Sequence, residues 1–148
     1  IGKDGGLLAH LPGDMKYFRE TTRGKVVVMG RKTLESFPGG RPLKNRINIV
    51  LTRSEAYHPE GVTVCRSREE TLKLLNAYAP EDVFIIGGGM ICEKAYVTHI
   101  FADFEADTDF PNLDADPAWH LAETGERRED NGIFYEFRVY ERRRGVNQ

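Results

Sequence analysis

Short runs of apolar, mostly β-branched residues alternate with amphipathic segments along most of the chain. Apolar runs of this length predict strands that are buried on both faces of a sheet. They lie at residues 25–30, 47–53, 61–65, 82–89 and 94–104.

Two segments between these runs predict short helices. The pattern becomes helical from Asp14, after Pro12 and Gly13, with Met15 and Phe18 as apolar positions. A second helix follows at residues 31–38 and must stop near its proline, because proline cannot continue a helix.

A longer amphipathic helix is predicted at residues 67–80. Ser67 is the expected N-cap, and Glu70 stands three residues later, as in a capping box. Leu72, Leu75 and Tyr78 are spaced for one apolar face.

The C-terminal part changes to alternating patterns. Segments 118–124 and 134–143 read as strands, and the turn sequence 130–132 precedes the second. Strands that alternate with helices and end in a hairpin predict an α/β fold. We expect a single domain over residues 1–148, with a mixed, mostly parallel central sheet flanked by helices and an antiparallel C-terminal hairpin.

One connection is too short for this topology. If strands 82–89 and 94–104 were parallel neighbours, they would need a crossover of about a dozen residues or more. Only residues 87–95 separate the two apolar cores. Either the strands are not parallel neighbours, or residues are absent after Ile91; we favour the absence.

Composition narrows the class of protein. The 148 residues carry 21 basic and 23 acidic side chains with mixed signs, so no nucleic-acid partner is expected. No apolar run is long enough for a membrane span. Cys65 and Cys92 lack zinc spacing, and the four histidines form no ligand pair. We expect a cytoplasmic protein without a metal.

Asp14 raises a question of its own. Aspartate at a helix start is commonly an N-cap, and from the local sequence this is the favoured interpretation. The alternative is a buried carboxylate that binds a ligand, since Asp14 and Phe18 share one helix face.

Basic and hydroxyl residues gather at predicted strand ends. Arg31 and Lys32 follow Gly30, Thr52 and Arg53 end the next strand, and three glycines follow a later one, at 87–89. Ligands of open α/β sheets collect beyond such ends, so a phosphate site is predicted. The GxxxxGK[ST] phosphate loop is absent, which argues against nucleoside-triphosphate hydrolysis.

Taken in order, these motifs resemble dihydrofolate reductase over nearly the whole chain. The segments "IGKDGGLLAHLPGDMKYFRETT", "VVVMGRKTLES", "RPLKNRINIVLTR", "FIIGGGMI", "AYVTHI", "ADTDFP" and "FYEFRVYERR" follow the order of that family.

The resemblance implies the parts of the site that bind substrate. Asp14 would bind the pterin 2-amino group and N3, and Thr98 would support that carboxylate; these two are the expected catalytic residues. Arg46 would pair with the α-carboxylate of the glutamate tail. The expected substrate-binding residues are Leu7, Met15, Phe18, Leu43 and Arg46.

It also implies NADPH as cofactor. The expected NADPH-binding residues are Ile1, Gly2, Gly30, Arg31, Lys32, Thr33, Leu51, Thr52, Arg53, Arg66, Ile86, Gly88, Gly89, Met90, Ile91 and Thr108. Ile1, Gly2 and Leu7 belong to the loop over the nicotinamide.

The implied activity is NADPH-dependent reduction of 7,8-dihydrofolate to 5,6,7,8-tetrahydrofolate, by hydride transfer to C6 and protonation at N5. Dihydrofolate and antifolate-like molecules would be the ligands of a monomer. Two alternatives stay open: a related pyrimidine reductase of riboflavin synthesis, and a non-catalytic nucleotide-binding remnant.

By the same resemblance, parts of the family pattern are missing. The first strand of the family would precede Ile1, and about seven residues would follow Ile91, where the connection is too short. We expect the protein to have residues that this sequence omits.

Overall fold

The computed structural model describes residues 2–4, 6–87, 94–107 and 109–143. The chain divides into two compact units, residues 1–16 with 91–148 and residues 17–90. Helix α1 (Pro12–Thr22) gives its first residues to one unit and the remainder to the other.

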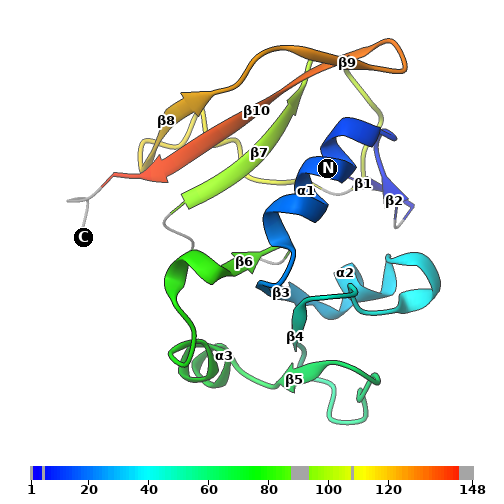
Figure 1. The fold of residues 1–148 in the computed structure, drawn as a ribbon, viewed down its shortest axis with the longest axis vertical. Helices are drawn as coiled ribbons and strands as arrows, with labels where there is room; N and C mark the ends of the chain where they lie inside the picture. The colour runs from blue at the N-terminus through cyan, green and yellow to red at the C-terminus, as the bar shows by residue number, and fades with distance from the viewer. Residues whose placement is uncertain (1, 5, 88–93, 108, 144–148) are drawn as a thin grey trace. The chain divides into compact units, whose positions relative to one another are not determined.

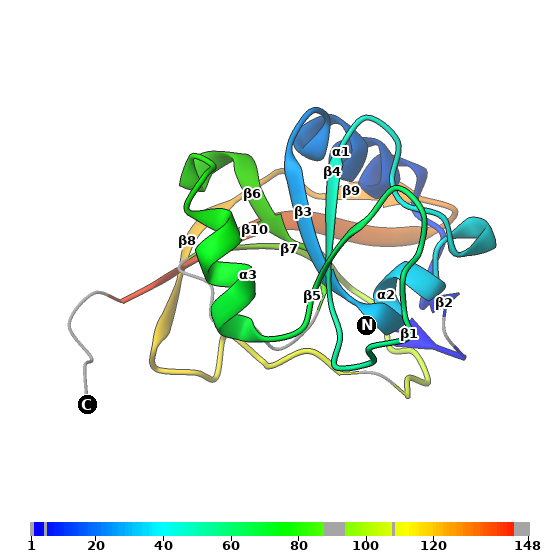
Figure 2. The ribbon, with the colours of Figure 1, turned by 90° about the horizontal axis from the view of Figure 1, so that it is seen from below.

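The unit of residues 17–90 is built on a parallel sheet in the order β5-β4-β3-β6. Figure 2 shows these strands and the longer helix of the unit. The elements in chain order are β3 (Val26–Gly30), α2 (Arg31–Glu35), β4 (Ile47–Leu51), β5 (Thr63–Cys65), α3 (Arg68–Leu75) and β6 (Val83–Ile85), with short 3-10 helices at Pro38–Gly40 and Pro80–Asp82.

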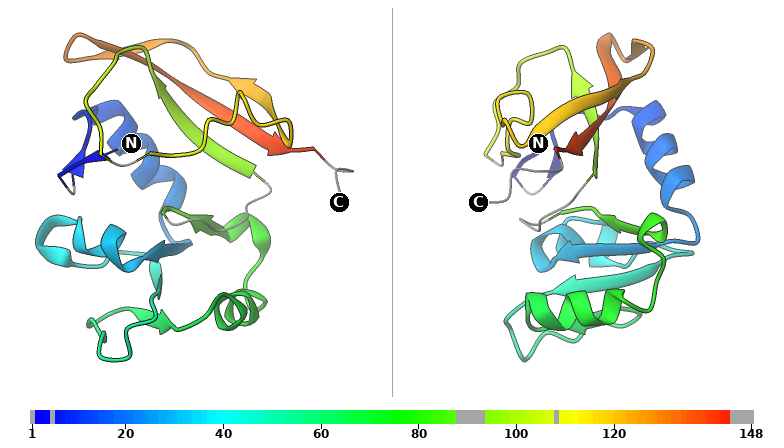
Figure 3. Two further views of the ribbon diagram at one scale, coloured as in Figure 1. Left: turned by 180° about the vertical axis from the view of Figure 1, so that it is seen from behind. Right: turned by 90° about the vertical axis from the view of Figure 1, so that its left-hand side faces the viewer.

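Alternating residues of β3 and β4 form two cores on opposite faces of this sheet, because successive strand side chains point to opposite sides. One core holds Val26, Val28, Ile49 and Cys65, with Leu74, Leu75 and Tyr78 packed against it. The other holds Val27, Met29, Leu34 and Val50. The right-hand view of Figure 3 shows α3 along the strands of the sheet.

The strands are confirmed where they were predicted, but several elements end early. β4 ends at Leu51, not at Arg53, because its parallel partner β3 pairs only as far as Gly30↔Leu51. The helix that begins at Arg31 ends at Glu35, before Pro38.

Helix α3 keeps its predicted cap, and Leu75 and Tyr78 of its predicted face pack against the core. The Ser67 Oγ accepts a hydrogen bond from the Glu70 N–H at 3.0 Å. The Glu70 carboxylate accepts from the N–H of Arg66, one residue before the cap residue of a capping box. Leu72 is wrong as a core residue, since it is 47% exposed.

The other unit is an antiparallel sheet with the order β7-β10-β8, in which β9 also pairs with β10. Its strands are β7 (Lys94–Ile100), β8 (Trp119–Thr124), β9 (Arg128–Asp130) and β10 (Ile133–Arg142). They run side by side in Figure 1. A separate two-stranded ribbon joins β1 (Gly2–Lys3) to β2 (Gly6–Leu7).

The predicted turn at residues 130–132 joins β9 to β10. Asn131 and Gly132 both have positive φ angles, 53° and 76°, and Asp130 pairs with Ile133. Two residues with positive φ form the tight turn that matches the twist of a hairpin. The antiparallel part is thus larger than one hairpin, since β7 and β9 also pair with β10.

The short connection before β7 links two strands that pair in different sheets. Within the described residues, β6 belongs to the parallel sheet and β7 pairs only with β10, so they are not parallel neighbours. The expected omission after Ile91 falls on residues 88–93, outside the described residues.

The α/β fold class is confirmed, with a parallel sheet, few helices and an antiparallel C-terminal sheet. The single domain over residues 1–148 stays a prediction. No helix among the described residues is long and apolar enough to cross a bilayer.

Candidate active site

Asp14 and Thr98 are brought together by the unit that contains the antiparallel sheet. The Thr98 hydroxyl on β7 donates a hydrogen bond to Asp14 Oδ1 in the first turn of α1. Both residues are half-buried. With Oδ1 held by threonine, Oδ2 of Asp14 and the lone pairs of the Thr98 hydroxyl remain as hydrogen-bond acceptors.

Asp14 is not the N-cap of helix α1. Met15 N–H donates to Leu11 O at 3.0 Å, so Leu11 stands at the N-cap and Asp14 lies inside the first turn. The N-cap interpretation favoured by the local sequence is therefore wrong. The side chain of Asp14 accepts instead from a distant strand.

The ribbon of β1 and β2 contains Gly2 and Leu7, two of the residues predicted to cover the nicotinamide. Gly2 pairs with Leu7, whose side chain is 66% exposed. Asp4 N–H donates to Asp107 Oδ2 at 2.8 Å, which ties this ribbon to the segment after β7. Ile1 lies outside the described residues.

Arg46 is held at the end of α1 within the unit of residues 17–90. Its Nε donates to Thr22 Oγ1 at 2.7 Å and its Nη2 to Arg19 O at 3.0 Å. The guanidinium carbon lies 5.8 Å from the centre of the Phe18 ring. These contacts bring two predicted substrate-binding residues together.

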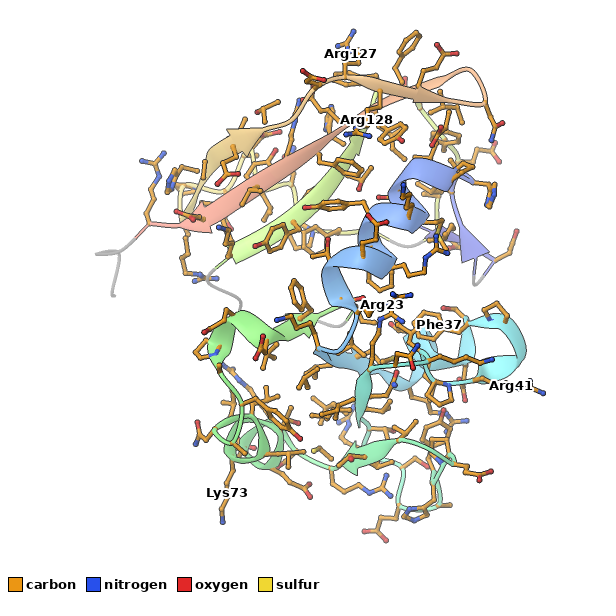
Figure 4. All side chains as sticks on the ribbon, viewed as in Figure 1. Arg23, Phe37, Arg41, Lys73, Arg127 and Arg128 are labelled. Atoms are coloured by element: carbon orange, nitrogen blue, oxygen red, sulfur yellow. The ribbon has the colours of Figure 1, made fainter. Side chains whose placement is uncertain are left out.

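The charge around Arg46 is uncompensated. Burial, followed by the positive charges of Arg23 and Arg19, lowers the pKa of Arg46 from its ordinary value. Within the described residues no carboxylate pairs with its guanidinium. Such a group favours an anionic ligand, and its planar fork suits a carboxylate. Figure 4 labels Arg23 near the end of α1.

A cavity of about 380 Å³ lies at the carboxyl ends of β4 and β5. It is lined by Leu51, Thr52, Arg53, Arg66, Ser67 and Arg68. Four of these were predicted to bind NADPH. Ser67 was predicted only as a helix cap, and Arg68 was missed, although both directly follow the β5 strand end where ligands collect.

The arginines of this cavity differ in their partners. Arg66 donates to the carbonyl groups of Ser54, Glu55 and Tyr57, so it braces the segment after β4. Within the described residues, the side chains of Arg53 and Arg68 have no hydrogen-bond or ion-pair partner, and both are exposed. Two unpaired guanidinium groups beside two hydroxyls form a donor set that suits a phosphate.

The start of α2 holds the other predicted cofactor residues. Arg31 Nε donates to Glu35 Oε1 at 2.6 Å, and its guanidinium carbon lies 4.5 Å from the centre of the Tyr57 ring. Lys32 is exposed. A Cβ at Gly87 would lie 2.4 Å from Thr33 Oγ1, so a glycine is required where the chain beyond β6 passes Thr33.

The remaining predicted residues fall into three groups. Leu43 and Ile86 pack against the core of Val27 and Met29. Met15 and Gly30 lie within the described residues, but no side-chain contact there indicates a role in binding. The cofactor residues outside the described residues are Ile1, Gly88, Gly89, Met90, Ile91 and Thr108. Among the described residues there is no cluster of three or more candidate metal ligands.

The family model of dihydrofolate reductase matches residues 1–142. The chain belongs to the dihydrofolate reductase family.

Two bacterial dihydrofolate reductases are similar to this chain over nearly its full length. The Bacillus subtilis enzyme is 40% identical over 152 residues, covering 97% of this chain and 88% of its own. The Staphylococcus haemolyticus enzyme is 38% identical and covers 96% of this chain and 88% of its own.

A solved structure of the dihydrofolate reductase from Enterococcus faecalis, complexed with NADP(H) and RAB-propyl, is similar with a TM-score of 0.82 and 39% identity. It covers 96% of this chain and 88% of its own. These similarities confirm the predicted family, fold and enzyme class, an NADPH-dependent reductase of dihydrofolate. The two alternative functions, a pyrimidine reductase of riboflavin synthesis and a non-catalytic nucleotide-binding remnant, are therefore set aside.

Proposed function

We propose that Asp14 and Thr98 bind the pterin of 7,8-dihydrofolate while this chain reduces it with NADPH to 5,6,7,8-tetrahydrofolate. The observation that carries the proposal is the hydrogen bond between Thr98 and Asp14. It joins two separate motifs of the family resemblance and leaves a half-buried carboxylate with a free oxygen.

The Asp14 carboxylate accepts hydrogen bonds from the pterin 2-amino group and N3. Thr98 fixes the orientation of the carboxylate, and a lone pair of its hydroxyl can accept from the 2-amino group. The negative charge of Asp14 favours the cationic pterin that is protonated at N5, because opposite charges attract more strongly where water is partly excluded. Water delivers that proton.

Arg46 binds the α-carboxylate of the glutamate tail. Support comes from its uncompensated charge beside Arg19 and Arg23 and from its contact with Phe18. The guanidinium is already oriented by backbone carbonyl groups, so little rotational freedom is lost when the substrate binds.

The cavity at the ends of β4 and β5 binds the phosphate that distinguishes NADPH from NADH. Its donors, Arg53 and Arg68 with the hydroxyls of Thr52 and Ser67, fit that group. When bound, NADPH supplies the hydride for C6 of the pterin. The residues of this chain bind and orient the two ligands.

We also propose a cytoplasmic monomer with one catalytic domain that binds neither nucleic acid nor a membrane. The match of a single family model to residues 1–142, across both units, supports one domain. The mixed charges and the net charge of −2 support the absence of a nucleic-acid partner. The enterococcal relative binds RAB-propyl together with NADP(H), which supports small antifolate-like ligands here.

The test is the loss of NADPH absorbance in the presence of dihydrofolate, with tetrahydrofolate measured separately. The proposal predicts one tetrahydrofolate formed for each NADPH consumed, and no consumption without dihydrofolate. Stoichiometric NADPH binding without any turnover would contradict it.

A further inference from the structure

The first turn of helix α1 lacks a cap from its own sequence. Leu11 at the N-cap is apolar and only 3% exposed, so it offers no side-chain oxygen to the N–H groups of the first turn. These N–H groups have no partner within the helix. The N–H of Gly13, the residue before Asp14, is one of them.

Asp130 supplies the missing acceptor. Its Oδ2 accepts from Gly13 N–H at 2.7 Å, across 117 residues of sequence. The same oxygen accepts from the Tyr135 hydroxyl at 2.9 Å. Asp130 therefore caps the helix from the end of β9, where the Asn131–Gly132 turn places it.

Tyr135 holds this carboxylate rigidly. It is 1% exposed and lies on β10 opposite Ile100 of β7. Phe137 lies opposite Thr98 in the same pair of strands, so the register places Tyr135 and Thr98 on one face of the sheet. That face thus makes two contacts with the first turn of α1: Thr98 with Asp14, and Asp130 with Gly13.

The fit at Gly13 leaves no room for a side chain. A Cβ there would lie 2.1 Å from the Tyr135 hydroxyl and 3.0 Å from Asp130 Oδ2. The hydroxyl belongs to a buried ring that cannot swing away. The place of the first turn is therefore determined by this pair of side chains.

We propose that Asp130, held by Tyr135, is a positioning residue for the reductase: it caps helix α1 at Gly13 and so fixes the place of Asp14. The inference rests on the proposed binding of the pterin by Asp14. Asp130 itself does not touch the substrate.

The experiment measures KM for dihydrofolate, kcat and Kd for NADPH in wild type, Asp130→Ala and Asp130→Asn. Losing a helix cap is expected to raise KM for dihydrofolate about tenfold in Asp130→Ala. Kd for NADPH should stay within about twofold, because the cofactor cavity lies in the other unit. Asp130→Asn keeps an oxygen acceptor and should stay within about threefold of wild type.

Glu129→Ala is the matched control. Glu129 is the neighbour of Asp130 on β9, its side chain is exposed, and the substitution removes the same charge. Its kinetic constants should equal those of wild type. An unchanged KM in Asp130→Ala, or an equal loss for dihydrofolate and NADPH, would overturn the role of Asp130.

A second pair of variants applies if Asp130→Ala does not fold. Gly13→Ala should raise KM for dihydrofolate because its methyl group meets the Tyr135 hydroxyl. Adding Tyr135→Phe removes that oxygen and leaves Asp130 Oδ2 3.0 Å and the ring carbon 3.4 Å from the added methyl group. The double variant should recover only part of the loss, because Asp130 is then no longer held by Tyr135. An unchanged KM for dihydrofolate in Gly13→Ala, or an equal loss for dihydrofolate and NADPH, would overturn the inference. Absence of wild-type turnover would instead contradict the proposed function.

Discussion

The Thr98 hydroxyl donates a hydrogen bond to the Asp14 carboxylate, although 84 residues separate the two in the chain. The contact joins β7 to the first turn of α1. It leaves one carboxylate oxygen for a ligand and fixes the direction in which that oxygen points.

Thr98→Val replaces the hydroxyl by a methyl group of similar size. A hydrogen bond to a charged group contributes about 1.5–3 kcal/mol, so kcat/KM for dihydrofolate should fall about 10- to 100-fold. Steady-state kinetics measure this, with Thr98→Ser as the control that keeps the donor. Equal values for the valine and serine variants would show that the hydroxyl has no role in binding.

Arg46→Gln removes the guanidinium that is assigned to the glutamate tail. KM for dihydrofolate should rise about 10- to 100-fold with little change in kcat, because this contact is made equally in the ground and transition states. A pterin substrate without a glutamate tail should lose almost nothing.

Arg41→Gln is the control for Arg46. Arg41 is exposed and its side chain extends outward from the loop before β4 (Figure 4). It should behave as wild type. If Arg46→Gln weakens both substrates equally, Arg46 acts on the fold and not on the carboxylate.

The double variant Arg53→Ala/Arg68→Ala tests the phosphate cavity. Kd for NADPH should rise about tenfold or more, whereas Kd for NADH, which lacks the extra phosphate, should change little. Fluorescence titration with both cofactors measures the difference. Lys73→Ala on α3, whose side chain points away from the unit in Figure 4, removes a cation outside the cavity. A loss of the same size for NADH, or in Lys73→Ala, would contradict the assignment.

Stability should fall at high pH partly through Tyr135. Burial, followed by its hydrogen bond to Asp130, raises the pKa of Tyr135 above its ordinary value. The folded state holds the Tyr135 proton more tightly than the unfolded state, in which a tyrosine has a pKa of about 10. This stabilises the folded state fully below about pH 10, and the contribution is lost as the pH rises through the pKa of Tyr135 in the folded state. The free energy of unfolding should therefore decrease above about pH 10.

Tyr135→Phe should show a smaller decrease in urea unfolding over the same pH range. Part of the decrease remains, because burial also raises the pKa of Tyr140 and of Cys65. Parallel curves for wild type and Tyr135→Phe would contradict the assignment of this pH dependence to Tyr135.

The parallel sheet was predictable because strands buried on both faces read as unbroken apolar runs. Val26 to Met29 on β3 are all nearly inaccessible, as their pattern indicates. The face of α3 was only partly predictable. Thr71, Leu74 and Leu75 form the buried side of the helix, and Tyr78 packs against the same core just beyond its end. The spacing of apolar residues predicts Leu72 at this face and gives no signal for the polar Thr71. Thr71 can be fully buried because its hydroxyl donates to Ser67 O at 2.9 Å.

The residues of the candidate site also differ in how far the sequence predicts them. Asp14, Thr98 and Arg53 lie in motifs that the sequence shows directly, and the resemblance gave each a role. Asp130 lies in a hairpin without such a motif, and its contact with Gly13 spans 117 residues. No local pattern reports a cap supplied from that distance. The preference of aspartate for N-cap positions also gave a wrong prediction for Asp14, because the residue at the N-cap is the apolar Leu11.

The most direct test of the account compares wild type with Asp14→Asn, which keeps the shape of the side chain and removes its charge. NADPH oxidation with dihydrofolate and the Kd for NADPH are measured for both proteins. We predict a fall in kcat/KM of about 100- to 1,000-fold with an unchanged Kd for NADPH, since the loss falls on electrostatic stabilisation of the reacting pterin. Turnover close to that of wild type in Asp14→Asn would contradict the account.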